Sequence, residues 1–227
     1  MTKSQLEIST PRPRRLACLA RYLLAAALMA VSSLAGASTL LRVSIDELTQ
    51  RAEFVFEGEV ADVQVQRSGA RGMVSTFVTF NVVEAIKGNP SAESIELKFL
   101  GGEFEGERLE VNGSRIPKLG ERGVYFVESL TQDLINPLLG WSQGHYLIEI
   151  EDGVEQVTSV NAKPIVSVAA PKTAAAASSS PAPARSAARL RVATQPRVAD
   201  GVVTGDADLD VGLSPQTFKQ QIRAHLP

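Results

Sequence analysis

Alternating hydrophobic and polar positions run through the first two thirds of this chain and predict short β-strands. The segments at residues 54–66 (FVFEGEVADVQVQ), 73–86 (MVSTFVTFNVVEAI) and 94–100 (SIELKFL) alternate with a period of two, the spacing of side chains that share one face of a strand. In the first segment the alternation slips by one residue at Ala61-Asp62, and such a slip indicates a β-bulge.

Further strands are expected at RLEV, GVYFVE, HYLIEI and VEQV. Asp152-Gly153, between the last two, is typical of a type I′ hairpin turn. No segment offers the repeated crossover helices that parallel strands require. The pattern therefore predicts an all-β domain over residues 38–168, about seven short strands in a closed or nearly closed barrel.

Two short helices accompany the strands. Ser44 and Glu47 have the spacing of a capping box, which predicts a helix over residues 44–52. Near the C-terminus Ser214 can cap a helix that has Pro215 at its first position and an apolar stripe along one side. A helix this short is marginal alone in water, so we expect it to dock on the domain or on a partner.

The composition of the rest of the chain divides it into three further segments. Residues 1–37 are a polar, arginine-bearing start, a short apolar run and small residues with an A-x-A site at Ala35 and Ala37, which predicts a secretory signal peptide. The apolar run from Tyr22 to Val31 is shorter than the about 20 residues of a membrane span, and an uncleaved anchor is the alternative. Residues 169–199, rich in Ala, Ser and Pro, are expected to form a disordered linker, and residues 200–227 form an acidic segment with the C-terminal helix.

Charge and cysteine content argue against several classes of function. The single cysteine, Cys18, lies in the signal peptide, so the predicted mature chain has no thiol chemistry and no disulfide. Residues 38–168 carry 20 acidic against 11 basic residues, whereas residues 169–199 carry five basic residues and no acid. An acidic body argues against nucleic acid, because phosphate contacts need clustered Lys and Arg. We expect a periplasmic or secreted protein without a stable membrane span after cleavage.

The order of the predicted helix and strands resembles the netrin-like module, the OB-fold domain of the tissue inhibitors of metalloproteinases. That family has a first strand of V-x-x-G/A-x-V character and a later strand that ends in F-x-V-x-x-x-x-K-G, here Val55 to Val60 and Phe80 to Gly88. The chain is also similar to exported proteobacterial proteins that carry GG, G-E-x-x-V-Y-F and Q-G segments. The resemblance covers about Ile45 to Ile150 and implies an OB-fold barrel.

The same resemblance implies inhibition of a metalloprotease. The family's inhibitors chelate the zinc of their target with the amine and carbonyl of an N-terminal cysteine. Here the predicted mature start is Ser38-Thr39. An α-amino group beside these residues can still approach a metal, but a terminus without a disulfide loses affinity to ordering entropy.

The glycine-rich stretch FLGGEFEGERLEVNG, residues 99–113, is the first candidate site. A phosphate cradle needs glycine N–H groups beside a helix N-terminus or a lysine, whereas four glutamates and one arginine occupy this stretch. We interpret Gly101-Gly102 as a bend and Asn112-Gly113 as a hairpin turn that closes RLEV. The alternative is a surface for a cation or a partner, formed by the glutamates.

An acidic loop near the C-terminus is the second candidate. Asp206, Asp208 and Asp210 occupy positions 1, 3 and 5 of an EF-hand-like loop. Position 6 is Val211 instead of glycine and position 12 is Thr217 instead of glutamate, which removes two oxygens from the calcium shell. We favour an acidic tail and keep weak calcium binding as the alternative; no other metal or cofactor is expected.

The segment GWSQGHYLIEI is the third candidate. Trp141, Gln143 and His145 could contact a partner from a barrel rim, although such a Trp more often covers the end of a core. Ser142 and His145 lack an identifiable orienting partner, so no catalytic residue is assigned. The sequence predicts a non-catalytic module that binds a protein partner in the envelope or outside the cell, with a metalloprotease regulator as the second hypothesis and a hydrolase as the third.

Overall fold

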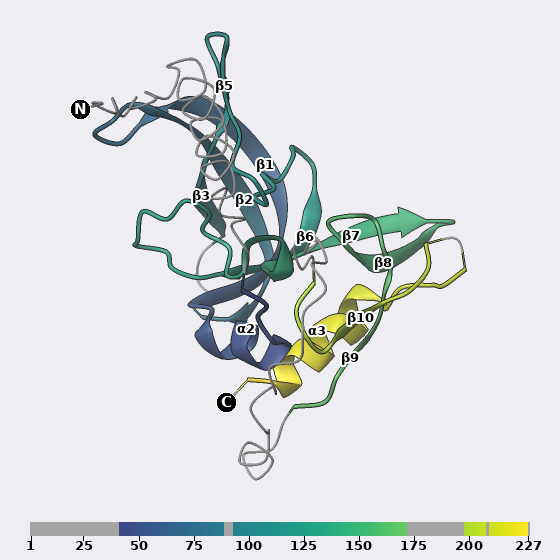
Figure 1. Cartoon of the computed structure of the whole chain (residues 1–227). Coiled ribbons are helices and arrows are strands. Elements are labelled where there is room, and N and C mark those ends of the chain that lie inside the picture. Colours follow the sequence, from purple (N-terminus) through teal and green to yellow (C-terminus); the bar gives the residue numbers. More distant parts are fainter. Residues whose placement is uncertain (1–40, 89–92, 172–197, 208, 227) are drawn as a thin grey trace, which may run out of the picture. The chain divides into compact units, whose positions relative to one another are not determined.

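The computed structural model describes residues 41–88, 93–171, 198–207 and 209–226, all of them within one compact unit, Leu40–Pro227. The predicted signal peptide and residues 172–197 of the predicted linker lie outside the described residues. Within the unit, strands dominate and two α-helices accompany them (Figure 1).

One antiparallel sheet of six strands forms the body, in the order β3-β2-β1-β6-β7-β8. Its strands are β1 (Phe54–Ser68), β2 (Met73–Lys87), β3 (Ser94–Leu100), β6 (Arg122–Val127), β7 (His145–Glu151) and β8 (Val154–Ser159). Two small ribbons join it: β4 (Gly102–Phe104) pairs with β5 (Glu107–Leu109), and β9 (Ile165–Val168) pairs with β10 (Val202–Thr204).

The sheet is open, so the predicted barrel is wrong and an OB-fold is not established. Closure needs the two edge strands, β3 and β8, to pair with each other. Instead, each edge strand donates a hydrogen bond to a segment outside the sheet: Leu100 donates its N–H to the carbonyl of Ile135 at 2.8 Å, and Val157 donates to that of Leu213 at 2.9 Å. Such bonds satisfy backbone groups of an edge without closure.

The predicted β-bulge is confirmed. The pairing of β1 with β2 shifts register between Val60 and Asp62, which leaves Ala61 as the extra residue. Val60 is buried and Val63 is half-buried, although the two residues have opposite parity. The bulge therefore lets hydrophobic residues before and after Ala61 face the same side of the sheet.

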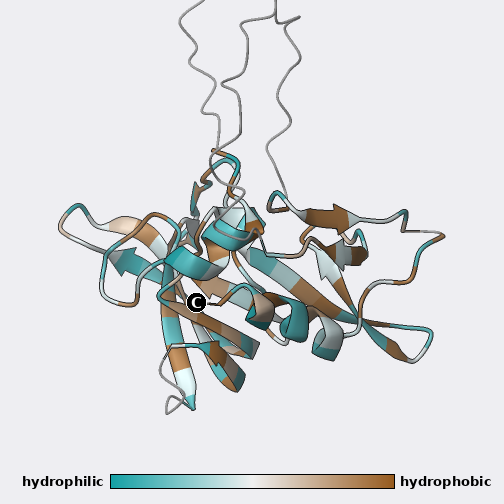
Figure 2. Ribbon diagram, turned by 90° about the horizontal axis from the view of Figure 1, so that it is seen from below, coloured by the Kyte–Doolittle hydropathy of each residue, from teal (hydrophilic) through white to brown (hydrophobic). Residues whose placement is uncertain are grey.

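Hydrophobic residues lie on both faces of the sheet, as the alternating bands along the strands in Figure 2 show. Within β1, Val55 belongs to one buried cluster, while Phe54 and Phe56 belong to the other. The second cluster is aromatic: the ring of Phe80 lies 5.5 Å from that of Phe56 and 4.7 Å from that of Tyr125. Loops cover this face, and the two helices cover the other.

The N-terminal helix α2 (Ile45–Arg51) has the predicted cap, since Ser44 Oγ accepts a hydrogen bond from the N–H of Glu47 at 3.1 Å. Its other end is capped from the end of β2. Lys87 Nζ donates to the carbonyls of Thr49, Gln50 and Ala52 at 2.7–2.8 Å. Burial lowers the pKa of this lysine, and its charge complements the negative end of the helix dipole.

The C-terminal helix α3 (Pro215–Ala224) docks on the domain. Ser214 caps it as predicted, and Phe218 and Ile222 are fully buried against the sheet. Between them, Lys219 donates to Glu57 of β1 at 2.5 Å and also contacts Glu84 of β2. The C-terminal helix is thus part of the same core as the sheet.

Candidate functional site

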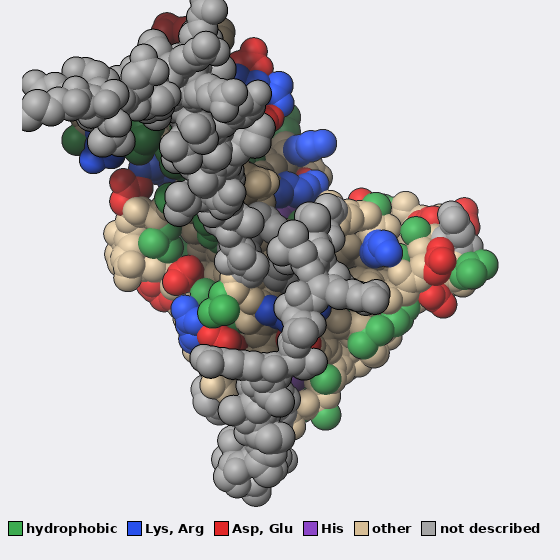
Figure 3. Space-filling model, viewed as in Figure 1, with side chains coloured by type: hydrophobic (Ala, Val, Ile, Leu, Met, Phe, Trp, Pro, Cys, Tyr) green, Lys and Arg blue, Asp and Glu red, His purple; other side chains and the backbone are tan. Residues whose placement is uncertain are grey.

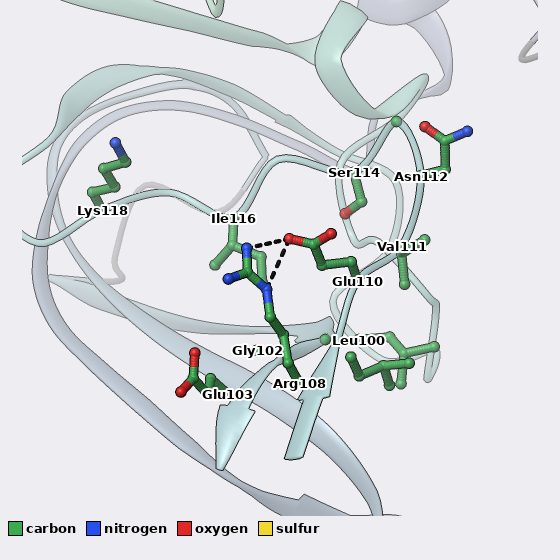
Figure 4. A pocket seen from close by; sticks show the side chains of 13 residues that line it. Leu100, Gly102, Glu103, Arg108, Glu110, Val111, Asn112, Ser114, Ile116 and Lys118 are labelled. Atoms are coloured by element: carbon green, nitrogen blue, oxygen red, sulfur yellow. Dashed lines mark hydrogen bonds and ion pairs between the residues drawn. The ribbon is translucent and has the colours of Figure 1, made fainter. Parts of the chain in front are cut away.

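A hollow in the described surface lies between the β4–β5 hairpin and the loop that follows it. We call this hollow the hairpin pocket; its volume is about 880 Å³. Figure 4 shows the side chains that line it. They are Leu100, Gly101, Gly102, Glu103, Arg108, Leu109, Glu110, Val111, Asn112, Gly113, Ser114, Ile116 and Lys118.

Gly101 and Gly102 line one side of this pocket and bend the chain there, as predicted. Their φ angles are +113° and +132°, values that side chains other than glycine rarely adopt. A Cβ atom on Gly102 would lie 2.6 Å from Thr76 Oγ1. Thr76 Oγ1 in turn donates to the carbonyl of Gly101 at 2.7 Å. The glycines therefore turn the chain sharply away from β3 while its backbone stays against the sheet.

The turn of the hairpin lies elsewhere than expected. Glu105 and Gly106, with φ of +50° and +82°, connect β4 to β5, so the predicted hairpin at Asn112-Gly113 is wrong. Those two residues form a tight turn, in which Ser114 donates its N–H to the carbonyl of Val111 at 3.0 Å. Because this second turn leads the chain back across the hairpin, the segment 110–118 becomes the opposite wall of the pocket.

The pocket has an aliphatic floor and a charged rim. Leu109, Val111 and Ile116 are half-buried. Arg108 pairs with Glu110 beside Ile116 (Figure 4), and hydrogen bonding to this carboxylate raises the pKa of the guanidinium. Lys118 and Glu103 complete the rim. Because charges of both signs lie at the opening, the pocket does not favour binding of a simple anion. The mixture of charges suits contact with the surface of a polypeptide.

A buried ionic cluster fixes the far end of the same loop. Glu121 accepts from Arg115 Nη1 and Nη2 at 2.8 and 2.6 Å, and its Oε1 lies 2.8 Å from His145 Nε2. Burial alone would raise the pKa of Glu121, but the hydrogen bonds from His145 and Arg115 outweigh it and hold this pKa at about 2. We call these three residues the carboxylate cluster.

The histidine of this cluster has its pKa shifted in the same direction, but by burial. Burial lowers the pKa of His145 and opposes the effect of Glu121. With Nε2–H donating to Glu121, Nδ1 is an acceptor, and it has no hydrogen-bond partner within the described part of the chain. The ring lies 4.9 Å from that of Tyr125. The cluster therefore ties the loop to β7 and has no accessible base.

The other residues of the GWSQGHYLIEI segment do not gather on a rim. Gln143, in the 3-10 helix η2 (Trp141–Gly144), is fully buried. Its Oε1 accepts from the N–H of Val43 at 2.9 Å and its Nε2 donates to the carbonyl of Leu41 at 3.0 Å. Trp141 is half-buried with φ of +58°. No hydrogen bond among the described residues joins Ser142 to His145, whose Nε2 is engaged by Glu121.

The acidic loop closes on itself. Asp210 Oδ2 accepts from the N–H of Asp206 at 2.8 Å, and the N–H of Asp210 donates to the carbonyl of Asp206 at 2.9 Å. Asp208 lies outside the described residues. No group of three or more metal-ligating side chains occurs in the part of the chain that the structure describes. Calcium binding at this loop stays a prediction.

Comparison with other proteins does not assign a function to the pocket. No protein-family model, curated protein or solved structure matches this chain. In the described ranges no helix has both the length and the apolar character needed to cross a membrane. Ser38 and Thr39 lie outside the described residues, so zinc chelation by a terminal amine also stays a prediction.

Proposed function

We propose that this chain is an exported, non-catalytic module that binds a protein partner in the cell envelope or outside the cell, with the hairpin pocket as its recognition surface. The observation that carries the proposal is the form of the pocket, a hollow of about 880 Å³ with an aliphatic floor and charges of both signs at its rim. A protein segment can place an apolar side chain on such a floor and pair its polar groups with the rim.

The walls of the pocket are held in place before any partner arrives. Arg67 of β1 pairs with Glu107 of β5 at 2.7 Å, which ties the hairpin to the sheet. The opposite wall is anchored through Arg115 and Glu121. A surface that is already ordered loses less conformational entropy on binding, which supports recognition over a merely structural hollow.

The charges at the rim of the pocket indicate the chemistry of the partner. Glu103 and Glu110 lie there together with Arg108 and Lys118. A partner whose contact surface carries groups of both signs is therefore favoured, and its association should slow as salt screens the attraction.

Two further hypotheses remain linked to this proposal. The order of α2, the bulged β1 and β2 supports a distant relation to the netrin-like module, although the open sheet departs from the barrel of that fold. Regulation of a secreted metalloprotease is a special case of partner binding. It requires the predicted terminus at Ser38, and no described residue favours it.

The test is capture of a partner from the native envelope fraction with the tagged chain from Ser38 onward. Lys118→Glu and Val111→Asp alter the rim and the floor of the pocket, and each should reduce the captured protein at least about tenfold. The matched controls Lys163→Glu and Val203→Asp change exposed residues outside the pocket and should capture as the wild type does. Equal capture by all five proteins would remove the pocket from the proposal.

A further inference from the structure

A second exposed surface lies at the tip of the β7–β8 hairpin and is separate from the hairpin pocket. Val154, Leu209 and Val211 are 57%, 83% and 77% exposed there, and together they line a cavity of about 220 Å³. We call these three residues the tip patch. In Figure 3 this end of the molecule shows hydrophobic and acidic side chains next to each other. Large aliphatic side chains in such a group mark an interaction site more often than single exposed ones do.

The exposure of these side chains does not come from a loosely held chain. On one side, Asp210 closes the turn that begins at Asp206, as described above. On the other side, Gln156 Oε1 accepts from the N–H of Gly212 at 2.6 Å, and the carbonyl of Leu213 accepts from Val157. A Cβ on Gly212 would lie 2.8 Å from the carbonyl oxygen of Val157, so the chain lies directly against β8.

Fixed anchors on both sides therefore hold Leu209 and Val211 toward solvent. A side chain with freedom to turn inward would bury its apolar surface, because burial is favourable by roughly 25 cal/mol per Å². Here the hydrogen bonds of the flanking residues prevent that. The tip patch is thus an ordered apolar surface with no cover from the described residues.

Charge identifies the kind of molecule that can cover the patch. Glu151, Asp152 and Asp210 line the same cavity, and no described residue that lines it is basic. A second copy of this chain would bring the same acids against these across a two-fold axis, which is unfavourable. An anionic lipid surface is disfavoured for the same reason. The complement is a surface with aliphatic and basic side chains together.

From this arrangement we propose that the tip patch docks a polypeptide segment of a partner protein in which aliphatic residues alternate with Lys or Arg. The aliphatic side chains of the segment pack on Leu209, Val211 and Val154, and its basic side chains pair with the surrounding carboxylates. Three exposed residues make a small contact, so the docking is of the weak and transient class. This surface is independent of the hairpin pocket and can add to its affinity when one partner reaches both.

The test is fluorescence anisotropy of labelled peptides titrated with the full chain. The probe is a 12-residue peptide of alternating Arg and Leu, compared with an alternating Glu and Leu peptide and an alternating Arg and Ser peptide. Of the three peptides, we expect only the Arg-Leu peptide to bind saturably. The double variant Leu209→Ser, Val211→Ser should bind this peptide at least about tenfold more weakly. Asp152→Asn, which keeps a residue suited to the positive φ of the turn, should weaken binding about two- to fivefold and reduce its salt dependence.

The control is Leu119→Ser, because Leu119 is 67% exposed and does not line the cavity at the tip. It should bind the Arg-Leu peptide as the wild type does. Circular dichroism should show the same fold for all variants, since each changes an exposed side chain. No binding by the wild type, equal binding of the Glu-Leu peptide, or an undiminished affinity of the double variant would each overturn the proposal. None of these results would affect capture through the hairpin pocket, which the Lys118 variant tests separately.

Discussion

Individual charged residues inside this protein are held by partners on distant strands, and this determines how the protein responds to acid. Glu121 has a pKa of about 2 in the folded chain against about 4.5 in the unfolded one. The folded state therefore binds fewer protons than the unfolded state between these values. His145 acts in the same direction, because its lowered pKa means that only the unfolded state gains a proton just below pH 6.5.

Acidification should accordingly lower the free energy of unfolding in two stages. The first, from His145, begins below about pH 6.5, and the second, from Glu121, runs from about pH 4.5 toward pH 2. The second amounts to about 3 kcal/mol if the whole shift of Glu121 is realised. Urea titrations of the wild type and of Glu121→Gln between pH 8 and pH 2 measure it. Parallel curves for the two proteins below pH 5 would rule out this carboxylate as the cause.

At the scale of elements, an ion pair holds the C-terminal helix to the sheet. Glu57 is fully buried, and it contacts both Lys219 of α3 and Arg122 of β6. Burial lowers the pKa of Lys219, but hydrogen bonds to Glu57 and Glu84 more than compensate and raise it. A buried pair adds little over well-packed apolar residues, yet loss of one partner is costly.

Lys219→Met should therefore destabilise the protein by about 3 kcal/mol, because Glu57 keeps only Arg122 as a cationic partner. The double variant Glu57→Gln, Lys219→Met should recover part of this loss, since no uncompensated charge remains. Arg51→Met removes a surface ion pair with Glu47 and should change stability by less than about 1 kcal/mol. Denaturant unfolding gives the three values, and a double variant no better than the single one contradicts the explanation.

The bend before β4 is a second element that a single substitution tests. Gly102→Ala should cost about 2–4 kcal/mol, because the new Cβ meets Thr76 Oγ1 at 2.6 Å in a backbone region that alanine avoids. Gly69→Ala is the matched control. Gly69 also has a positive φ, of +71°, but a Cβ there has no atom within 4 Å, so only the cost of about 1 kcal/mol for the backbone remains. Equal losses in the two variants would show that the close approach at Gly102 does not matter.

The sequence predicted most elements because their signals are local. The cap at Ser44, the slip at Ala61 and the turn at Asp152-Gly153 each depend on neighbouring residues, and the structure has all three. Sheet closure and the contacts of the pocket depend on residues far apart. Arg115 and His145, for instance, are 30 positions apart and meet through Glu121. The sequence contains one sign of such a contact. Glu57 has the same parity as the buried Val55, so its side chain faces the interior, and a charged group there indicates a buried partner.

At the scale of the whole molecule, residues far along the chain complete the buried cluster on one face of the sheet. Phe218, Ile222 and Val202 belong to the same buried cluster as Leu48 and Val55. A chain that ends at Pro171 loses these side chains and the ammonium of Lys219. It should lack a cooperative unfolding transition and the near-ultraviolet circular dichroism of packed aromatic residues. Addition of a separate fragment of residues 198–227 should restore both. A truncated chain that unfolds cooperatively at the wild-type midpoint would show that the fold does not depend on these C-terminal residues.

Photo-crosslinking in the native envelope tests recognition through the hairpin pocket. A photoreactive amino acid replaces Asn112, an exposed residue that lines the pocket, in one chain and the exposed Lys163 in another. We expect one dominant protein adduct from position 112, with a yield that falls as salt rises, and little or no adduct from position 163. No adduct at position 112, or the same adducts at equal yield from both positions, would show that the pocket does not bind the partner.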